Sequence, residues 1–421
     1  MFDVVPSRQA FLLGAIILVL LCRPAFSEPL GADLQRLVEA MERFHPALNA
    51  ASASRDAAAA EIEIAGALDD PQFGASFEDI DREDDGPLPQ RVGSIFYSIE
   101  QTFPLGGKRA LRRKIAQAGV AEAATERDQT LLDLTAQMKT AFAQHALAIL
   151  TARTIQQEGD TLRDLAEIAR DRYAQGLGRQ QDAFEAEAEL AALEGALADA
   201  ERDRAIAVGR INALIGRSVE SPLAQPAALP PILDAAALDT AELIALAERR
   251  SPALAARTAA IDGANASRDL AERNWYPDLT LGVSVVDEDR DITGYEAKVG
   301  FNIPLQWGLR RSQQAQAKAR LAEAKARASA ARVELSAAIV EALENLRAAN
   351  AREAAMRTKQ LPRLAEAVQA AQRAYAADQA DLADAIGAAR RFKQAEIEHI
   401  GMLFEQQTLL AELERLVGGS L

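Results

Sequence analysis

The residues best suited to metal binding or proton transfer are the three histidines, His45, His145 and His399. They stand 100 or more positions apart and show no metal-ligand spacing such as His-x₃-His. Carboxylates are abundant, but no pair stands out as an acid/base couple, and no phosphate-binding or nucleophile-elbow motif is found. The sequence therefore predicts no catalytic residue, no metal site and no cofactor, and we expect a protein that is not an enzyme.

The single cysteine, Cys22, lies in an N-terminal segment typical of an export signal. Arg8 precedes an apolar run of eleven residues, Phe11 to Leu21, and small residues surround a cleavage position near Ser27. We therefore expect a signal peptide over residues 1–27. Lipidation of Cys22 is an alternative, although Leu21 before it is larger than such a site normally has. After cleavage the chain would hold no disulfide and no thiolate ligand.

Composition points to long helices and excludes one class of partner. The 421 residues are 49% hydrophobic, 26% charged and only 5% aromatic, and alanine dominates. Such a mixture is typical of coiled coils and long helices rather than of compact enzymes. The net charge is −15, with 62 acidic and 47 basic residues, so a nucleic acid is not expected as a partner.

The sequence repeats itself once. Residues 45–48 recur as 251–254 at an offset of 206, and residues 103–105 recur as 303–305 at an offset of 200. Tyr173 and Tyr375 match at an offset of 202. Ordered anchors of this kind indicate an internal duplication. The predicted organisation is a first repeat at 28–220, a proline-rich linker at 221–236, and a second repeat at 237–421.

Each repeat shows the same predicted order of elements. An alanine-rich helix (31–68 or 238–275) ends before a proline, and a strand pair follows. A very long helix (106–173 or 307–375) then leads through a turn into a returning helix, 179–216 or 381–418. At 1.5 Å per residue, each long helix would extend on the order of 100 Å. The fold class predicted is mainly α with a small β part.

The strand segments alternate between apolar and polar residues, clearly in 93–103, 278–285 and 294–303 and more weakly in 73–77. A sheet packed on a soluble core and the wall of a transmembrane barrel would both show this pattern. Strand lengths of about 9–11 residues, acidic linkers at 79–85 and 287–291, and helices too long to cover the sheet favour the barrel. The predicted lipid-facing residues are Ile95, Tyr97, Leu281, Val283, Val299 and Phe301.

A barrel of this kind needs several chains. Each chain supplies four predicted strands, whereas the smallest usual barrels have about eight and lipid tolerates no open sheet edge. Identical copies must therefore share one barrel, and their helices should form a matching closed tube.

The chain resembles the outer-membrane efflux proteins of the TolC type over about residues 30–420. The resemblance rests on the duplication, the strand pairs and the strand-to-helix junctions at 101–109 and 301–305. It implies a homotrimer with a 12-stranded barrel in outer-membrane lipid and a periplasmic tunnel of antiparallel helices. It also implies the exit duct of a tripartite pump in a Gram-negative bacterium, with a periplasmic adaptor (membrane fusion) protein and an inner-membrane RND-type pump as partners.

The junction Gly106-Gly107-Lys108-Arg109 is more similar to the branch of that family that serves heavy-metal cation efflux. That resemblance implies passive conduction of divalent heavy-metal cations from the periplasm to the exterior. A multidrug channel and a type I secretion channel remain alternatives within the same class. A periplasmic coiled-coil adaptor or scaffold is the alternative from another class.

Acidic residues near the helix-to-helix turns are candidates for a periplasmic gate, because the resemblance implies acidic rings at the tip of the tunnel. Asp182 and Asp384 are equivalent at the 202-residue offset, and Glu185 follows one helical turn after Asp182. The second repeat has Gly387 in place of Glu185. The alternative interpretation is a solvated helix face rich in acids.

Overall fold

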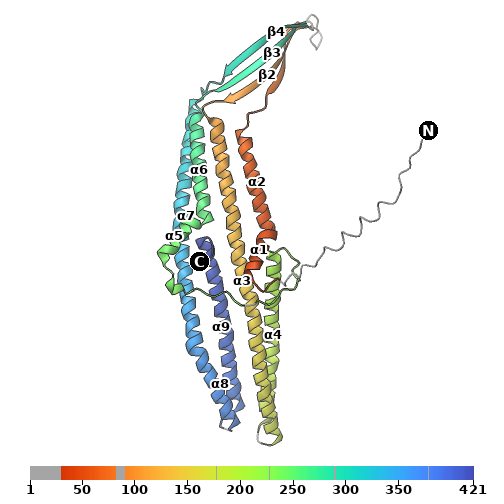
Figure 1. Ribbon diagram of the computed structural model, residues 1–421, viewed down its shortest axis with the longest axis vertical. Helices are drawn as coiled ribbons and strands as arrows, with labels where there is room; N and C mark the ends of the chain where they lie inside the picture. Colours follow the sequence, from red (N-terminus) through yellow and green to blue (C-terminus); the bar gives the residue numbers. More distant parts are fainter. Residues whose placement is uncertain (1–29, 82–90, 177, 227, 289–290, 378) are drawn as a thin grey trace, which may run out of the picture.

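The computed structural model describes residues 30–81, 91–176, 178–226, 228–288, 291–377 and 379–421. The predicted signal peptide with Cys22 lies outside the described residues, as do residues 82–90 and 289–290, which include parts of the two acidic linkers. The molecule is long and narrow, with a small sheet at one end and the turns of two helical hairpins at the other (Figure 1).

The order of elements occurs twice along the chain. The first half contains α1 (Leu34–Phe44), α2 (Pro46–Gly66), β1 (Gln72–Asp81), β2 (Arg91–Pro104), α3 (Lys108–Ala174) and α4 (Gln180–Leu214). The second half contains η1 (Ala235–Ala237), α5 (Thr240–Arg250), α6 (Pro252–Arg273), β3 (Asp278–Glu288), β4 (Asp291–Phe301), α7 (Trp307–Ala355), η2 (Met356–Gln360), α8 (Leu361–Ala376) and α9 (Leu382–Val417). The fold is mainly helical with a small antiparallel sheet, as the sequence predicts.

The first helix of each half is split in two, which the sequence-based expectation of single helices at 31–68 and 238–275 missed. His45 and Ser251 both adopt extended backbone angles, with ψ of 125° and 117°, and each precedes a proline that starts the next helix. Proline disfavours the helical conformation of the residue before it and lacks an amide hydrogen, so it suits the first position of a helix and breaks a continuous one.

The two long helices differ by one turn of π-helix. Buried positions of α3 and α7 match at an offset of 201: Met138 with Ile339 and Phe142 with Leu343. Beyond η2 the match of Tyr173 with Tyr375 requires 202. The π-turn at Met356–Gln360 therefore holds the one-residue insertion, directly before Pro362 in α8. The expected single helix over 307–375 is thus interrupted, whereas α3 runs unbroken for 67 residues.

The four strands form one antiparallel sheet in the order β1-β2-β3-β4. Ile99 of β2 lies opposite Phe73 on one side and Val283 on the other, and Leu281 of β3 lies opposite Val299 of β4. Strand β4 ends at Phe301, so Ile303, expected as its last residue, lies outside it. Within the described ranges, β1 and β4 are the edges of the sheet, each paired along one side only.

Helix α3 is the spine of the molecule and packs on α2, α4, α6 and α9. One core cluster joins α1, α3 and α4 around Met41 and Met138, and another joins α5, α7 and α9 around Leu343. A third lies between the hairpins around Leu162, whose side chain is fully buried. Burial of one such leucine contributes about 1.5–3 kcal/mol. In the described part of the chain, every helix falls short of the length or apolar content needed to cross a membrane.

Candidate functional site

The sheet has one apolar face, and the six residues predicted to face lipid all lie on it. Residues paired across antiparallel strands share a face. The register aligns Ile95, Tyr97, Leu281, Val283, Val299 and Phe301 with other apolar residues or with one another, apart from Gln101 opposite Leu281 and Asp287 opposite Ile95. All except the half-buried Ile95 are exposed, with Val283 at 60% and Val299 at 65%. Their contact with lipid stays a prediction.

The opposite face of the sheet is polar and internally paired. The Lys298 ammonium donates to the Glu100 carboxylate over 2.7 Å, and the hydroxyls of Thr102 and Thr280 lie 3.1 Å apart. Ser284 lies on this face, next to Val283 in the strand but on the other side of the sheet. The alternation seen in the sequence is therefore a true division between two faces.

The Gly106-Gly107-Lys108-Arg109 junction ties the sheet to the helices. Both glycines have positive φ angles, 71° and 77°, which residues other than glycine rarely adopt. The ammonium of Lys108, only 4% exposed, donates to the Tyr276 carbonyl (2.8 Å) and the Asp278 carboxylate (2.7 Å). The Arg109 guanidinium donates to the Gly66 carbonyl at the end of α2. The motif thus has a structural function at the base of the sheet.

The gate candidates lie at the hairpin end of the molecule, at the starts of α4 and α9 (Figure 1). Asp182 and Glu185 are half-buried, and Asp384 is exposed. Gln181 donates to Glu185 over 2.9 Å, and within the described residues no hydrogen bond or ion pair joins Asp384 to the other two. Both aspartates occupy the first helical turn, where a carboxylate favours the helix by about 0.3–1 kcal/mol.

The two hairpin ends contact each other through Arg172 and Tyr375. The Arg172 guanidinium donates to the Tyr375 carbonyl over 2.9 Å and lies 5.0 Å from the centre of its ring. Tyr375 is 4% exposed, so this contact is largely shielded from water. Further along, Arg179 and Asp381 approach to 4.0 Å, an exposed pair of small energetic weight.

A charged seam between α3, α4 and α9 is the feature that sequence reasoning missed. Arg390 of α9 pairs with Glu189 of α4 through two nitrogens, one contact being 3.1 Å. Lys393 lies 3.4 Å from Glu158 of α3. Burial raises the pKa of Glu158 to about 7, and burial also raises the pKa of Glu396. At the 202-residue offset of the hairpins Glu189 corresponds to Arg391 rather than to Arg390, so the repeat pattern alone does not identify this pair.

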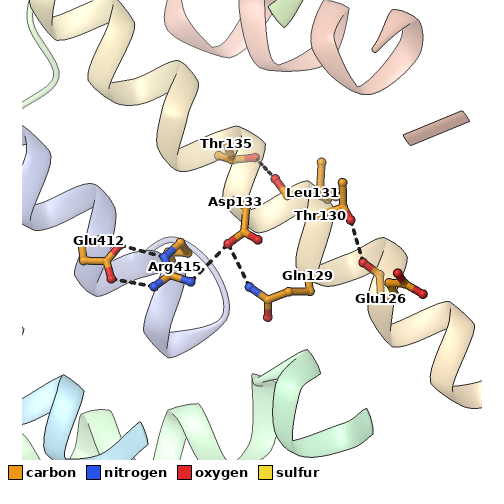
Figure 2. A network of polar contacts seen from close by, with 8 residues as sticks. All are labelled: Glu126, Gln129, Thr130, Leu131, Asp133, Thr135, Glu412 and Arg415. Carbon is orange, nitrogen blue, oxygen red and sulfur yellow. Dashed lines mark hydrogen bonds and ion pairs between the residues drawn. The ribbon is translucent and has the colours of Figure 1, made fainter. Parts of the chain in front are cut away.

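A second polar network joins α3 to α9 (Figure 2). The Arg415 guanidinium donates to both Glu412 oxygens, at 2.8 and 2.6 Å, and to Asp133 at 3.2 Å. Gln129 donates to the same Asp133 oxygen over 3.0 Å. Hydrogen bonds to the acidic partners raise the pKa of Arg415 further above its usual range. Arg415 thus holds one carboxylate from each repeat, and this network fastens α3 of the first repeat to α9 of the second.

The three histidines are far apart and have separate environments. His45 accepts a hydrogen bond from the Ala47 amide (3.1 Å) and so caps α2. His145 is 1% exposed on α3, and burial lowers its pKa. His399 contacts Glu353 over 2.9 Å. Across the described ranges, no three residues among histidine, cysteine, aspartate and glutamate come together in a group able to hold a metal ion.

A duplicated helical body with an antiparallel sheet of exposed apolar face defines a class of envelope channel proteins. Comparison with protein families agrees with this class. The chain matches the family described as outer membrane efflux protein over residues 37–217 and 243–419, and it belongs to that family. The protein is thus localised to the outer membrane, with its helical part in the periplasm.

Two relatives are similar over part of the chain. Protein CyaE of Bordetella pertussis is 29% identical over 267 residues, covering 60% of this chain and 55% of that protein. The nickel and cobalt resistance protein CnrC of Cupriavidus metallidurans is 29% identical over 268 residues, covering 62% of this chain and 60% of CnrC. The matches thus span less than two thirds of either relative.

Solved structures share the fold over nearly the whole chain. The outer-membrane channel OprN superposes with a TM-score of 0.79 at 20% identity, covering 92% of this chain and 90% of OprN. CusC superposes with a TM-score of 0.78 at 13% identity, covering 92% of both chains. The TM-scores establish a common fold, and at identities this low they establish the fold alone.

Proposed function

We propose that this protein is the outer-membrane exit duct of a tripartite efflux pump and conducts its substrate passively. The observation that carries the proposal is the four-stranded sheet, which has two open edges and an exposed apolar face. Three copies related by a threefold axis would pair β4 of one chain with β1 of the next and close a 12-stranded barrel without free edges. Family membership favours such a channel over the alternative of a periplasmic adaptor.

Divalent heavy-metal cations are the proposed substrate. Two observations support them: the similarity to CnrC, a nickel and cobalt resistance protein, and the Gly-Gly-Lys-Arg junction. Energy and direction would come from an inner-membrane RND-type pump, joined to the duct by a periplasmic adaptor. The duct itself needs no catalytic group, because it offers a path across the outer membrane rather than a reaction.

Growth of a gene-deletion strain tests the proposed substrate. We expect greater sensitivity to nickel, cobalt, zinc or copper than in the parent, and recovery when the wild-type gene is restored. Sensitivity to drugs with unchanged metal tolerance would instead identify a multidrug channel. Loss of a secreted polypeptide, without either phenotype, would identify a type I secretion channel.

The mass of the purified protein tests the proposed assembly. In mild detergent we expect a trimer that resists SDS without boiling. A stable monomer or dimer would contradict the 12-stranded barrel. Release from membranes without detergent would contradict barrel insertion and restore the adaptor interpretation.

A further inference from the structure

Helix α7 has an exposed side with the pattern of a coiled-coil seam. Buried Leu321 and Ile339 mark the side of α7 that faces the rest of the chain. On the other side, small or apolar residues follow one another at alternating spacings of four and three: Ala315, Ala319, Ala322, Ala326, Ser329 and Val333. All six are exposed, Val333 by 70%. Alternation of four and three keeps a stripe on one face along a helix and is the pattern by which helices pair.

Cations flank this stripe at every seventh residue. Arg311, Lys318, Lys325 and Arg332 are all exposed and occupy equivalent positions beside the seam. Arg332 pairs with Glu248 of α5 at 3.2 Å. The other three form no ion pair with any described residue of the chain. Their concentration on one flank, in a protein of net charge −15, indicates an acidic partner surface.

Helix α2 has the complementary side. Opposite its contact with α3, the residues Ala50, Ala53, Ala57, Ala60 and Ile64 are exposed and follow the same alternation of spacings. Asp56 and Glu63 occupy the flanking positions, again seven residues apart, and both are exposed. Among the residues that the structure describes, Asp56 pairs only with its neighbour Arg55, at 2.8 Å between two exposed side chains, so it remains available for a stronger partner.

A contact inside the chain shows how these two faces would meet. The upper helices pack in the order α2, α3, α6, α7, so α2 and α7 are the outer members of the row (Figure 1). At the α3–α6 contact, a Cβ placed on Gly263 would lie 3.2 Å from that of Ala118. The repeat offsets of 201 and 206 carry Ala118 to Ala319 and Gly263 to Ala57, which lie on the two exposed stripes. The α3–α6 contact is therefore a template for a pairing of α7 with α2.

These two helices cannot meet within one chain, because they stand at opposite ends of the row of four helices. Along the chain, α2 leads into the edge strand β1, and α7 follows the edge strand β4. We propose that α7 of one copy packs on α2 of the next copy as an antiparallel coiled-coil seam, with Lys318 facing Asp56 and Arg311 facing Glu63. This inference rests on the proposed trimer and specifies the contact that selects a second copy of this chain as the neighbour. In antiparallel pairs equivalent flanks face each other, so the cations of α7 meet the acids of α2.

Charge reversal and restoration test the seam in the full-length protein in outer membranes. Lys318→Glu should lower the temperature at which the SDS-resistant oligomer dissociates, because like charges then face each other. Adding Asp56→Lys should restore it. Arg320→Glu is the matched control, an equal charge change at an exposed residue on another side of α7, and should leave the dissociation temperature near that of the wild type.

Disulfide trapping provides a second measurement that does not depend on the stability of a charge variant. Ala57→Cys combined with Ala319→Cys should yield covalent oligomers on oxidation, whereas Ala57→Cys with Arg320→Cys should not. Suppose that the wild-type protein is a trimer but Lys318→Glu and Arg320→Glu have the same dissociation temperature, or that both restoration and trapping fail. Either result would contradict the α7–α2 seam and leave the trimer standing. A monomeric wild-type protein would overturn both.

Discussion

Glu158 of α3 and Lys393 of α9 form an ion pair in the charged seam between α3, α4 and α9. The two groups are 3.4 Å apart, and their side chains are only 9% and 14% exposed. Burial raises the pKa of the Glu158 carboxyl to about 7. Lys393 opposes this change, whereas Glu189 and Glu396 add repulsion. Neither carboxyl oxygen of Glu158 accepts a hydrogen bond in the described part of the chain. The seam therefore holds a group that titrates near neutral pH.

The first prediction is a stability that depends on Glu158 and pH. Its folded pKa of about 7 exceeds its ordinary value of 4.5, so the folded state binds more protons between these limits. The contribution of Glu158 to stability should fall as pH rises through this window, by at most about 1.4 kcal/mol per pH unit. Glu158→Gln should abolish this component in thermal unfolding followed by circular dichroism at pH 5 and pH 8. Glu167→Gln, an exposed position on the same helix, is the control, and identical profiles for the two variants would refute the assignment.

The second prediction has the opposite sign and concerns His145. Burial lowers its pKa, Arg204 acts in the same direction, and the backbone of Ala224 opposes them. The folded state therefore binds fewer protons, so the stability that depends on a neutral ring is present above the ordinary pKa of 6.5 and is lost as pH falls below it. His145→Leu should reduce this loss, and the equivalent residue of the second repeat, the fully buried Leu346, shows that leucine suits the position.

Thermal midpoints at pH 5 and pH 7.5 measure this effect. His399→Gln serves as the control, because His399 is only half-buried and contacts Glu353 of α7. Acid sensitivity that persists unchanged in His145→Leu would show that other groups dominate.

The third prediction separates the two faces of the sheet. Val283→Arg places a charge on the apolar face, which is proposed to meet lipid, and should cost about 2–4 kcal/mol near the bilayer midplane. Ser284→Arg changes the neighbouring residue on the polar face and should be tolerated far better. Yields of SDS-resistant oligomer in outer membranes compare the two variants, and equal damage would mean that the face assignment is wrong.

Local patterns explain why much of the fold follows from the sequence. Alternation in residues 278–285 predicted β3, because strand side chains point to opposite faces by geometry alone. The long α3 followed from the lack of proline over its length. The breaks at His45 and Ser251 were also readable, since each precedes a proline, but the sequence on both sides of each break is typical of a helix and obscured them.

The charged seam could not be predicted in the same way. Glu158 and Lys393 lie far apart in the sequence, and their pairing depends on how α9 packs on α3. Nothing local distinguishes Glu158 from the many solvated glutamates of these helices. The one-residue insertion at η2 likewise became visible only when buried positions on both sides of it were compared.

The last prediction concerns the gate candidates at the hairpin ends. In one chain Asp182 and Asp384 are not joined to each other, so any ring of charge would need three copies around one axis. Six carboxylates gathered in this way would concentrate cations at the mouth and discourage anions. In planar bilayers, Asp182→Asn combined with Asp384→Asn should therefore lower cation selectivity and weaken block by divalent cations.

Assembly of the same double variant should be unchanged. Each asparagine gives up a favourable interaction with the start of its helix, about 0.3–1 kcal/mol, and disturbs no buried contact. Asp164→Asn with Glu366→Gln removes two exposed carboxylates outside the first turns of α4 and α9 and is the matched control. If both double variants conduct like the wild type, with the same selectivity and block, the two aspartates act only as favourable helix starts. If selectivity or block changes only in Asp182→Asn with Asp384→Asn, the charge that selects cations lies at the first turns of α4 and α9.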